Sequence, residues 1–188
     1  MTIGINQLSS GMGLMIDGDL YLVQDYHHVK PGKGTAFARV KLKNIKNDTV
    51  VEKTFKTADK LEDVQLEEHE LEFLYQGGGA YHFMNHETFE QVELTLDEIG
   101  SARDFLLENL TVTGLMYGQQ VLKIILPIFV EAEITYAEPG LKGDSSKAGT
   151  KPARIATDAT IQVPLFVEQG DRIKIDTRTA EYVERIKI

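Results

Sequence analysis

One short segment of the chain could do chemistry through a single projecting charge. It reads Lys30-Pro31-Gly32-Lys33-Gly34-Thr35 and lies between two runs of alternating apolar and polar residues. Pro-Gly followed by another glycine is typical of a hairpin tip, and the flanking glycines keep bulky side chains away from Lys33. An exposed turn lysine without a function is the simpler interpretation. A slim basic tip is, however, suited to entering a narrow anionic cavity, and RNA is the natural candidate.

The run that follows this tip, residues 36–44, has one cationic face. Ala38, Val40 and Leu42 alternate with polar or larger residues, so they share the face that a strand would bury. The opposite face carries Phe37 and the cations Arg39, Lys41 and Lys43. We expect this face to contact RNA phosphates together with Lys30.

Other chemistries are poorly supported. The Gly32-Lys33 pair does not make a phosphate-binding loop, because that motif needs Gly at position 27 and Ser or Thr at position 34. His82 and His86 lie four apart in a segment that reads as strand and turn, where that spacing does not place them on one face. The chain has no Gly-x-Ser-x-Gly motif. We therefore predict neither an enzyme nor a metal site, and no cofactor.

Composition narrows the class of protein further. The 188 residues include 20 Lys and Arg against 29 Asp and Glu, a net charge of −9, which argues against a generic DNA-coating protein. Cys is absent, so no disulfide or Cys-ligated metal is possible. The first basic residue is Lys30, unlike a secretory signal, and no apolar run reaches the roughly 20 residues of a membrane span. We expect a cytoplasmic protein with no membrane partner.

Short alternating runs separated by turn residues predict an all-β protein. Hairpins are expected around Asp17-Gly18, the three glycines 77–79 and Gly118-Gln119, and Leu71, Phe73 and Tyr75 should share one face. A helix is expected where Leu96, Ile99, Ala102 and Leu106 recur at helical spacing, with Thr95 as its N-cap. Later strands are expected at residues 110–117, 120–126, 130–134, 160–167, 172–176 and 182–186. Residues 138–151 read as a long polar loop, of a length that is usually functional or mobile.

Charge changes sharply along the chain. Residues 27–58 carry eight cations and two carboxylates, whereas residues 59–108 carry two cations and fourteen carboxylates. Such asymmetry suggests separate tasks for separate domains. We place boundaries near Asp63 and Pro127, which divides the chain into residues 1–63, an acidic unit at 64–127, and residues 128–188.

The order of several motifs resembles bacterial translation elongation factor P along essentially the whole chain. The resemblance rests on the residues from Val29 to Asn44, on 51–55 and 82–91, on Pro139-Gly-Leu-Lys-Gly-Asp144, and on Lys151-Pro-Ala153 with Val163-Pro-Leu-Phe-Val167. The chain departs from the family at Asp158, where Gly is usual, and at Ser145, where Thr is common. Asp tolerates a left-handed backbone, so we expect the fold to be unaffected.

The resemblance implies three small β-barrels in an L-shaped, tRNA-like arrangement: an SH3-like (KOW-type) domain and then two OB-type domains. It also implies a monomer that binds the 70S ribosome between the peptidyl- and exit-tRNA sites. Such factors stimulate peptide bond formation at consecutive prolines. Lys33 would reach the end of the peptidyl-tRNA in the P site, which is catalysis by positioning and not by acid or base work.

The resemblance extends to individual residues. Lys33 would carry a covalent β-lysyl or other extension, added by a lysyl-tRNA-synthetase-like ligase, with Lys30, Pro31, Gly32 and Gly34 forming its loop. Gly143, Asp144 and Ser145 would lie near the exit-site codon, and Tyr182 and Arg185 would contact RNA by stacking and charge. Core packing is the alternative interpretation for Tyr182. The alternative for the whole chain is a factor-P-like OB-type RNA-binding paralogue without anti-stalling activity.

Overall fold

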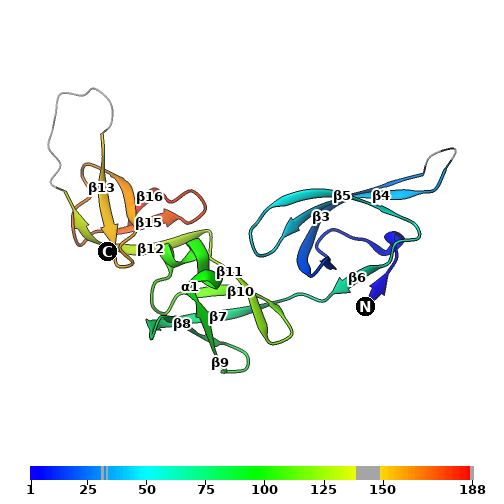
Figure 1. Cartoon of the computed structure of the whole chain (residues 1–188). Helices are drawn as coiled ribbons and strands as arrows, with labels where there is room; N and C mark the ends of the chain where they lie inside the picture. Colours follow the sequence, from blue (N-terminus) through cyan, green and yellow to red (C-terminus); the bar gives the residue numbers. More distant parts are fainter. Residues whose placement is uncertain (31, 33, 139–148, 187–188) are drawn as a thin grey trace. The chain divides into compact units, whose positions relative to one another are not determined.

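The computed structural model describes residues 1–30, 32, 34–138 and 149–186. Within this part of the chain the protein is built almost entirely of antiparallel strands, which form three sheets (Figure 1). The all-β prediction is therefore confirmed. The predicted division into residues 1–63, 64–127 and 128–188 and the L-shaped arrangement stay predictions.

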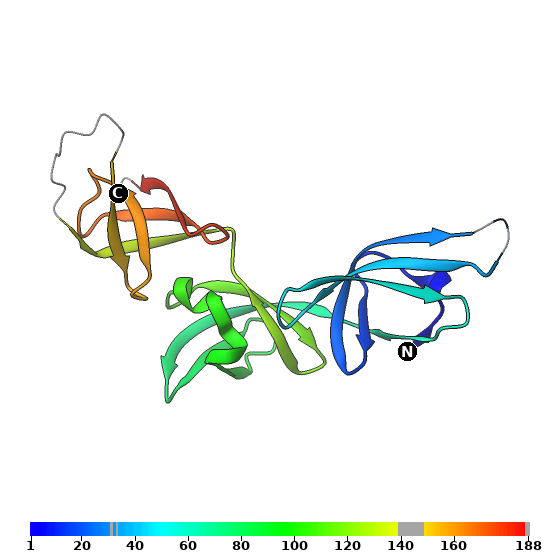
Figure 2. The same cartoon turned by 45° about the horizontal axis from the view of Figure 1, so that its top comes forward.

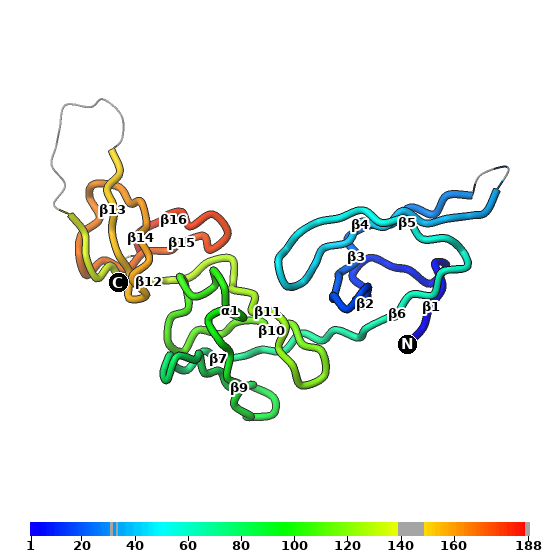
Figure 3. The backbone as a smooth tube through the Cα atoms, in the orientation of Figure 1, coloured from blue at the N-terminus to red at the C-terminus, as the bar shows by residue number. Residues whose placement is uncertain are grey.

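The first sheet has six strands in the order β1-β6-β2-β3-β4-β5. Its elements are β1 (Thr2–Ile3), the 3-10 helix η1 (Ile5–Gln7), β2 (Gly13–Ile16), β3 (Asp19–Val29), β4 (Phe37–Asn44), β5 (Val50–Lys56) and β6 (Leu61–Val64). The N-terminus lies beside β6 (Figure 3), where the Met1 ammonium donates a 2.7 Å hydrogen bond to the Asp63 carbonyl. Ala38, Val40 and Leu42 are fully buried, as their alternation predicted.

The turn between β2 and β3 follows from its two residues. Ile16 pairs with Asp19, so Asp17 and Gly18 alone make the turn, and both have positive φ, 55° and 88°. This is the conformation of the tightest hairpin turns, which Asp-Gly favours. The predicted hairpin is confirmed.

The second sheet has five strands in the order β11-β10-β7-β8-β9. Its elements are β7 (Glu67–Gly77), β8 (Ala80–Asn85), β9 (Gln91–Thr95), the helix α1 (Leu96–Ile99), the 3-10 helix η2 (Gly100–Phe105), β10 (Thr111–Tyr117) and β11 (Gln120–Ile125). The predicted hairpins at glycines 77–79 and at Gly118-Gln119 are both present.

Two details of this second sheet differ from the sequence prediction. Tyr75 does not share the buried face of Leu71 and Phe73: its side chain is 46% exposed, because a bulge between Phe73 and Tyr75 shifts the pairing with β8. The predicted helix is one turn of α-helix that continues as η2, since Gly100 adopts a φ of 57° at its end.

The third sheet has five strands in the order β14-β13-β12-β15-β16. They are β12 (Phe129–Ala137), β13 (Thr150–Ile155), β14 (Thr160–Pro164), β15 (Arg172–Asp176) and β16 (Glu181–Ile186) (Figure 2). The loop predicted at residues 138–151 includes Lys151, but Lys151 belongs to β13 and is buried, and its Nζ donates a 2.8 Å hydrogen bond to the Glu138 carbonyl. Residues of β13 alternate between exposed and buried, and Lys151 takes a buried position. A charged residue at that position conceals the strand pattern in the sequence.

Contacts group the described chain into two compact units. One comprises residues 1–68 and 115–123, and the other comprises residues 69–114 and 124–188. The outer end of the β10–β11 hairpin therefore packs with the first sheet.

Candidate nucleic-acid interface

The predicted tip connects two strands whose pairing continues to its base. Val29, the last residue of β3, pairs with Phe37, the first residue of β4, so residues 30–36 form the connection (Figure 1). Thr57, which directly follows β5, donates a 2.8 Å hydrogen bond from its hydroxyl to the Ala36 carbonyl at the end of this connection. The base of the connection is thus held by two neighbouring segments.

The described residues of the tip are exposed. Lys30, Gly32 and Gly34 all face solvent, and Gly34 has a φ of 117°, a conformation that side chains disfavour. Pro31 and Lys33 lie outside the described residues. In sequence, Lys33 is the middle residue of the connection.

The predicted basic face of β4 exists, but its three cations differ in availability. Arg39 and Lys41 are exposed, and the Arg39 guanidinium lies 5.9 Å from the centre of the Phe37 ring. Opposite them on β3 are His27 and Asp25, which contact each other at 3.3 Å. Arg39 and Lys41 have no ion-pair partner among the described residues, which leaves both free for an anion.

Lys43 is only partly exposed and is engaged within the protein. Its Nζ lies 2.8 Å from Oδ1 of Asp48, whose carboxylate also accepts hydrogen bonds from Lys123. Partial burial opposes ionisation of Asp48, but the two lysines outweigh it and lower the pKa of this carboxyl. No local pattern in the sequence predicts the contact of Lys123 with Asp48, because the two residues are 75 positions apart.

The predicted C-terminal contacts are only partly described. Gly143, Asp144 and Ser145 lie outside the described residues. Tyr182 is half-buried and packs against the core of the third sheet, which agrees with the core-packing alternative. Arg185 is exposed; its guanidinium lies 5.6 Å from the centre of the Phe166 ring and 3.4 Å from Asp171 Oδ2.

Two cation–aromatic pairs in the third sheet have no counterpart in the predicted site. The Lys174 ammonium lies 5.0 Å from the Phe129 ring, and the Arg154 guanidinium lies 5.9 Å from the Tyr136 ring. Both rings are about half exposed, at 45% and 51%. Such a ring and cation together suit a base and its phosphate, but Lys174 Nζ also lies 3.3 Å from Glu184 Oε1, which leaves Arg154 as the freer cation of the two. Strand register brings each pair together, so no motif in the sequence marks them.

The histidines of the second sheet are satisfied by nearby acceptors. His86 Nε2 lies 3.1 Å from Glu72 Oε2, and His82 Nε2 lies 3.3 Å from the Gly77 carbonyl. Within the described ranges, no three His, Asp or Glu side chains are grouped to hold a metal ion.

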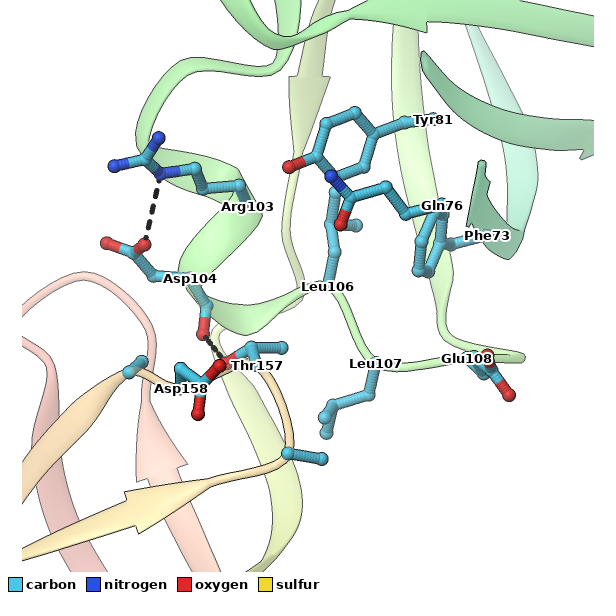
Figure 4. Close-up of a pocket in the computed structure, with 12 residues that line it drawn as sticks. Phe73, Gln76, Tyr81, Arg103, Asp104, Leu106, Leu107, Glu108, Thr157 and Asp158 are labelled. Atoms are coloured by element: carbon cyan, nitrogen blue, oxygen red, sulfur yellow. Dashed lines mark hydrogen bonds and ion pairs between the residues drawn. The ribbon is translucent and has the colours of Figure 1, made fainter. Parts of the chain in front are cut away.

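A hollow of about 600 Å³ lies beside η2 and the turn between β13 and β14 (Figure 4). Its charged lining is Arg103, Asp104, Glu108 and Asp158, and Arg103 is already paired with Asp104 at 3.4 Å. Thr157 and Asp104 both line the hollow, and the Thr157 hydroxyl donates a 2.6 Å hydrogen bond to the Asp104 carbonyl. Three carboxylates against one paired cation make this hollow unsuitable for phosphate.

No helix in the described part of the chain has the length and hydropathy that a bilayer crossing requires.

The fold is shared with a class of translation factors. A solved translation initiation factor 5A from Methanococcus jannaschii matches 66% of this chain and 94% of its own, with a TM-score of 0.52 and 26% identity. A second such protein, from Naegleria fowleri, has a TM-score of 0.54 over 66% of this chain but only 16% identity, which supports the fold alone.

Sequence comparison then specifies the family. Three models match in order: the elongation factor P KOW-like domain at residues 4–61, its OB domain at 66–124 and its C-terminal domain at 130–185. Elongation factor P of Natranaerobius thermophilus is 46% identical over 97% of both chains, and that of Symbiobacterium thermophilum is 48% identical over 97% of this chain and 99% of its own. The chain belongs to the elongation factor P family.

Membership makes the protein a translation elongation factor and not an enzyme, with the ribosome as its implied partner. The KOW-like and OB domains predicted from the resemblance are confirmed.

Proposed function

We propose that this factor binds the 70S ribosome between the peptidyl- and exit-tRNA sites and stimulates peptide bond formation at consecutive prolines. Lys33 positions the end of the P-site peptidyl-tRNA, and a lysyl-tRNA-synthetase-like ligase extends it with a β-lysyl or similar group. The factor acts in the cytoplasm as a monomer.

The observation that carries this proposal is the connection between β3 and β4. Its base is held by the Val29–Phe37 pair and by Thr57, and its exposed described residues are Lys30, Gly32, Gly34 and Thr35. The adjoining strand offers Arg39 and Lys41 to phosphates. A basic loop on an anchored two-strand base can carry one lysine into a confined RNA site while the strand binds the RNA that surrounds it.

The chemistry suits a factor without acid or base groups. Proline is a constrained nucleophile, so peptidyl transfer to it is limited by geometry. Holding the tRNA end in an attack-ready position raises the rate by orientation. An extended lysine adds reach and further hydrogen-bond donors toward RNA backbone oxygens.

The test is reconstituted translation of a triple-proline reporter. Protein purified from its own host should relieve stalling, Lys33→Ala should not, and a mixture without factor sets the baseline. Lys60→Ala, an exposed lysine far from the tip in sequence, is the matched control and should behave as the native protein. The mass of the native Lys33 peptide shows whether the lysine is extended. Ribosome binding without any rescue would contradict the proposal and favour a paralogue without anti-stalling activity.

A further inference from the structure

Three charged side chains from distant segments meet at one carboxylate. Asp48 lies in the turn between β4 and β5, Lys43 is near the end of β4, and Lys123 lies in β11. Lys43 Nζ contacts Asp48 Oδ1 at 2.8 Å, and Lys123 Nζ contacts both carboxylate oxygens. All three side chains are between 31% and 51% exposed, so the cluster is partly shielded from water.

The turn that carries Asp48 is held in a fixed conformation. The Asp48 N–H donates a 3.0 Å hydrogen bond to the Asn44 carbonyl. The buried Asn44 side chain accepts hydrogen bonds from the N–H groups of Lys46 and Asn47, at 2.9 and 3.3 Å. Because the backbone is already ordered, placing the carboxylate between the lysines costs little further entropy.

The cluster depends on the negative charge at its centre. The ammonium groups of Lys43 and Lys123 repel each other. An ionised Asp48 carboxylate between them attracts both, so the sum of the three interactions becomes favourable. Loss of the Asp48 charge therefore removes two attractions and exposes one repulsion.

Lys123 belongs to the hairpin end that packs with the first sheet, since residues 115–123 and 1–68 form one compact unit. Asp48 and Lys43 belong to that sheet. We propose that Asp48 is an electrostatic latch that holds the end of the β10–β11 hairpin against the first sheet, so that the two move as one body. This role does not depend on the proposed function.

The experiment measures the distance between spin labels across the latch. The chain has no Cys, so Thr54→Cys on β5 and Gln119→Cys in the hairpin turn give two unique, exposed labelling sites. Asp48→Asn removes the charge but suits the left-handed φ of 58° at this position, which preserves the turn. The ratio of open to latched molecules should rise roughly fivefold, the change that an ion pair of ordinary strength gives.

Two further variants separate the latch from general damage. Lys123→Met removes the hairpin's charge without touching the turn, and it should broaden the distance distribution as Asp48→Asn does. Asp17→Asn is the matched control: it removes the 3.1 Å pair with Lys53 in the same sheet, does not involve the hairpin, and should leave the distribution unchanged. High salt should open the unmodified latch, because it screens partly exposed pairs.

An unchanged distribution in both Asp48→Asn and Lys123→Met would overturn the latch. Equal broadening in Asp17→Asn would overturn it as well, since the effect would then reflect surface charge in general.

Discussion

Asp176 is a carboxyl whose pKa is lowered by a residue in the turn that follows it. It ends β15, and Arg178 donates to it through the backbone N–H and Nε at 3.0 Å each and through a terminal nitrogen at 2.6 Å. The side-chain hydrogen bonds of Arg178, followed by its backbone N–H, lower the pKa of Asp176 to about 2. Because the folded value lies below the unfolded one, this contribution to stability is complete above about pH 4 and disappears as the pH falls toward 2.

Arg178→Ala should raise the pKa of Asp176 toward the ordinary aspartate value, because it removes both side-chain donors and the cation. The check is an NMR titration of the Asp176 carboxyl carbon in both proteins. Arg172→Ala, an exposed arginine on the same strand, should leave the titration unchanged. An unshifted midpoint in Arg178→Ala would show that the turn backbone alone sets this value.

Asp158 stands where the family usually has Gly, and it adopts a φ of 64°. The expectation that Asp accepts this left-handed turn is thus met. Asp158→Ala should lower the free energy of unfolding relative to Asp158→Gly by about 1 kcal/mol, since a left-handed backbone disfavours a Cβ that has no polar group to compensate. Urea unfolding of the two variants measures the difference, and equal midpoints would contradict it.

At the scale of elements, local hydrogen bonds explain where the helix α1 begins. The Thr95 N–H and hydroxyl donate to Glu98 Oε2 at 2.7 and 2.8 Å. These bonds lower the pKa of Glu98, that from the backbone first and that from the hydroxyl second. The predicted N-cap is therefore correct, although the helix is shorter than predicted.

Thr95→Ala should destabilise the protein by about 1 kcal/mol, the usual cost of losing such a cap. Thermal or urea unfolding at neutral pH measures it. Thr111→Ala, an exposed threonine on β10, is the control and should change stability by much less. A loss in Thr111→Ala as large as that in Thr95→Ala would assign the effect to threonine in general.

Close approach of two strands requires Gly13. A Cβ at this position would lie 2.6 Å from the Val64 carbonyl oxygen of β6, the strand with which β2 pairs. Gly13→Ala should therefore destabilise the first sheet by about 1–3 kcal/mol through overpacking. Gly4→Ala, where no atom lies within 4 Å of the added Cβ, is the control for urea unfolding. Equal stability of the two variants would show that β6 moves aside freely.

At the scale of the whole molecule, charge is distributed by sheet and not evenly. Residues 27–58 carry eight of the 20 cations and two carboxylates, whereas residues 59–108 carry two cations and fourteen of the 29 carboxylates, so RNA attraction should be strongest at the first sheet. Lys43 contributes less than its sequence suggests because Asp48 neutralises it.

Salt dependence of tRNA binding tests this distribution. Lys41→Ala and Arg39→Ala should each reduce the slope of log affinity against log salt by roughly one, because each removes one phosphate contact. Lys43→Ala should reduce it much less. Lys60→Ala provides the control for nonspecific charge, and a full unit lost in Lys43→Ala would show that RNA displaces Asp48.

The sequence by itself determined many of the strands, though not β6, β9 or β13, and it determined the hairpin turns and the family. These follow from information within a few residues: alternation buries Ala38, Val40 and Leu42, Asp17-Gly18 accepts positive φ, and long ordered motifs identify relatives. The RNA-contact roles of Lys33, Arg39 and Tyr182 remain predictions from resemblance.

Only the tertiary structure decided which distant groups meet. The bulge before Tyr75 depends on the pairing of β7 with β8, and the inward position of Lys151 depends on a carbonyl thirteen residues away. Lys123 contacts Asp48 only once both sheets have formed, because a single charged residue in a sequence does not indicate which distant residue it will pair with. Pairing register and long-range packing, which no local pattern encodes, set these contacts.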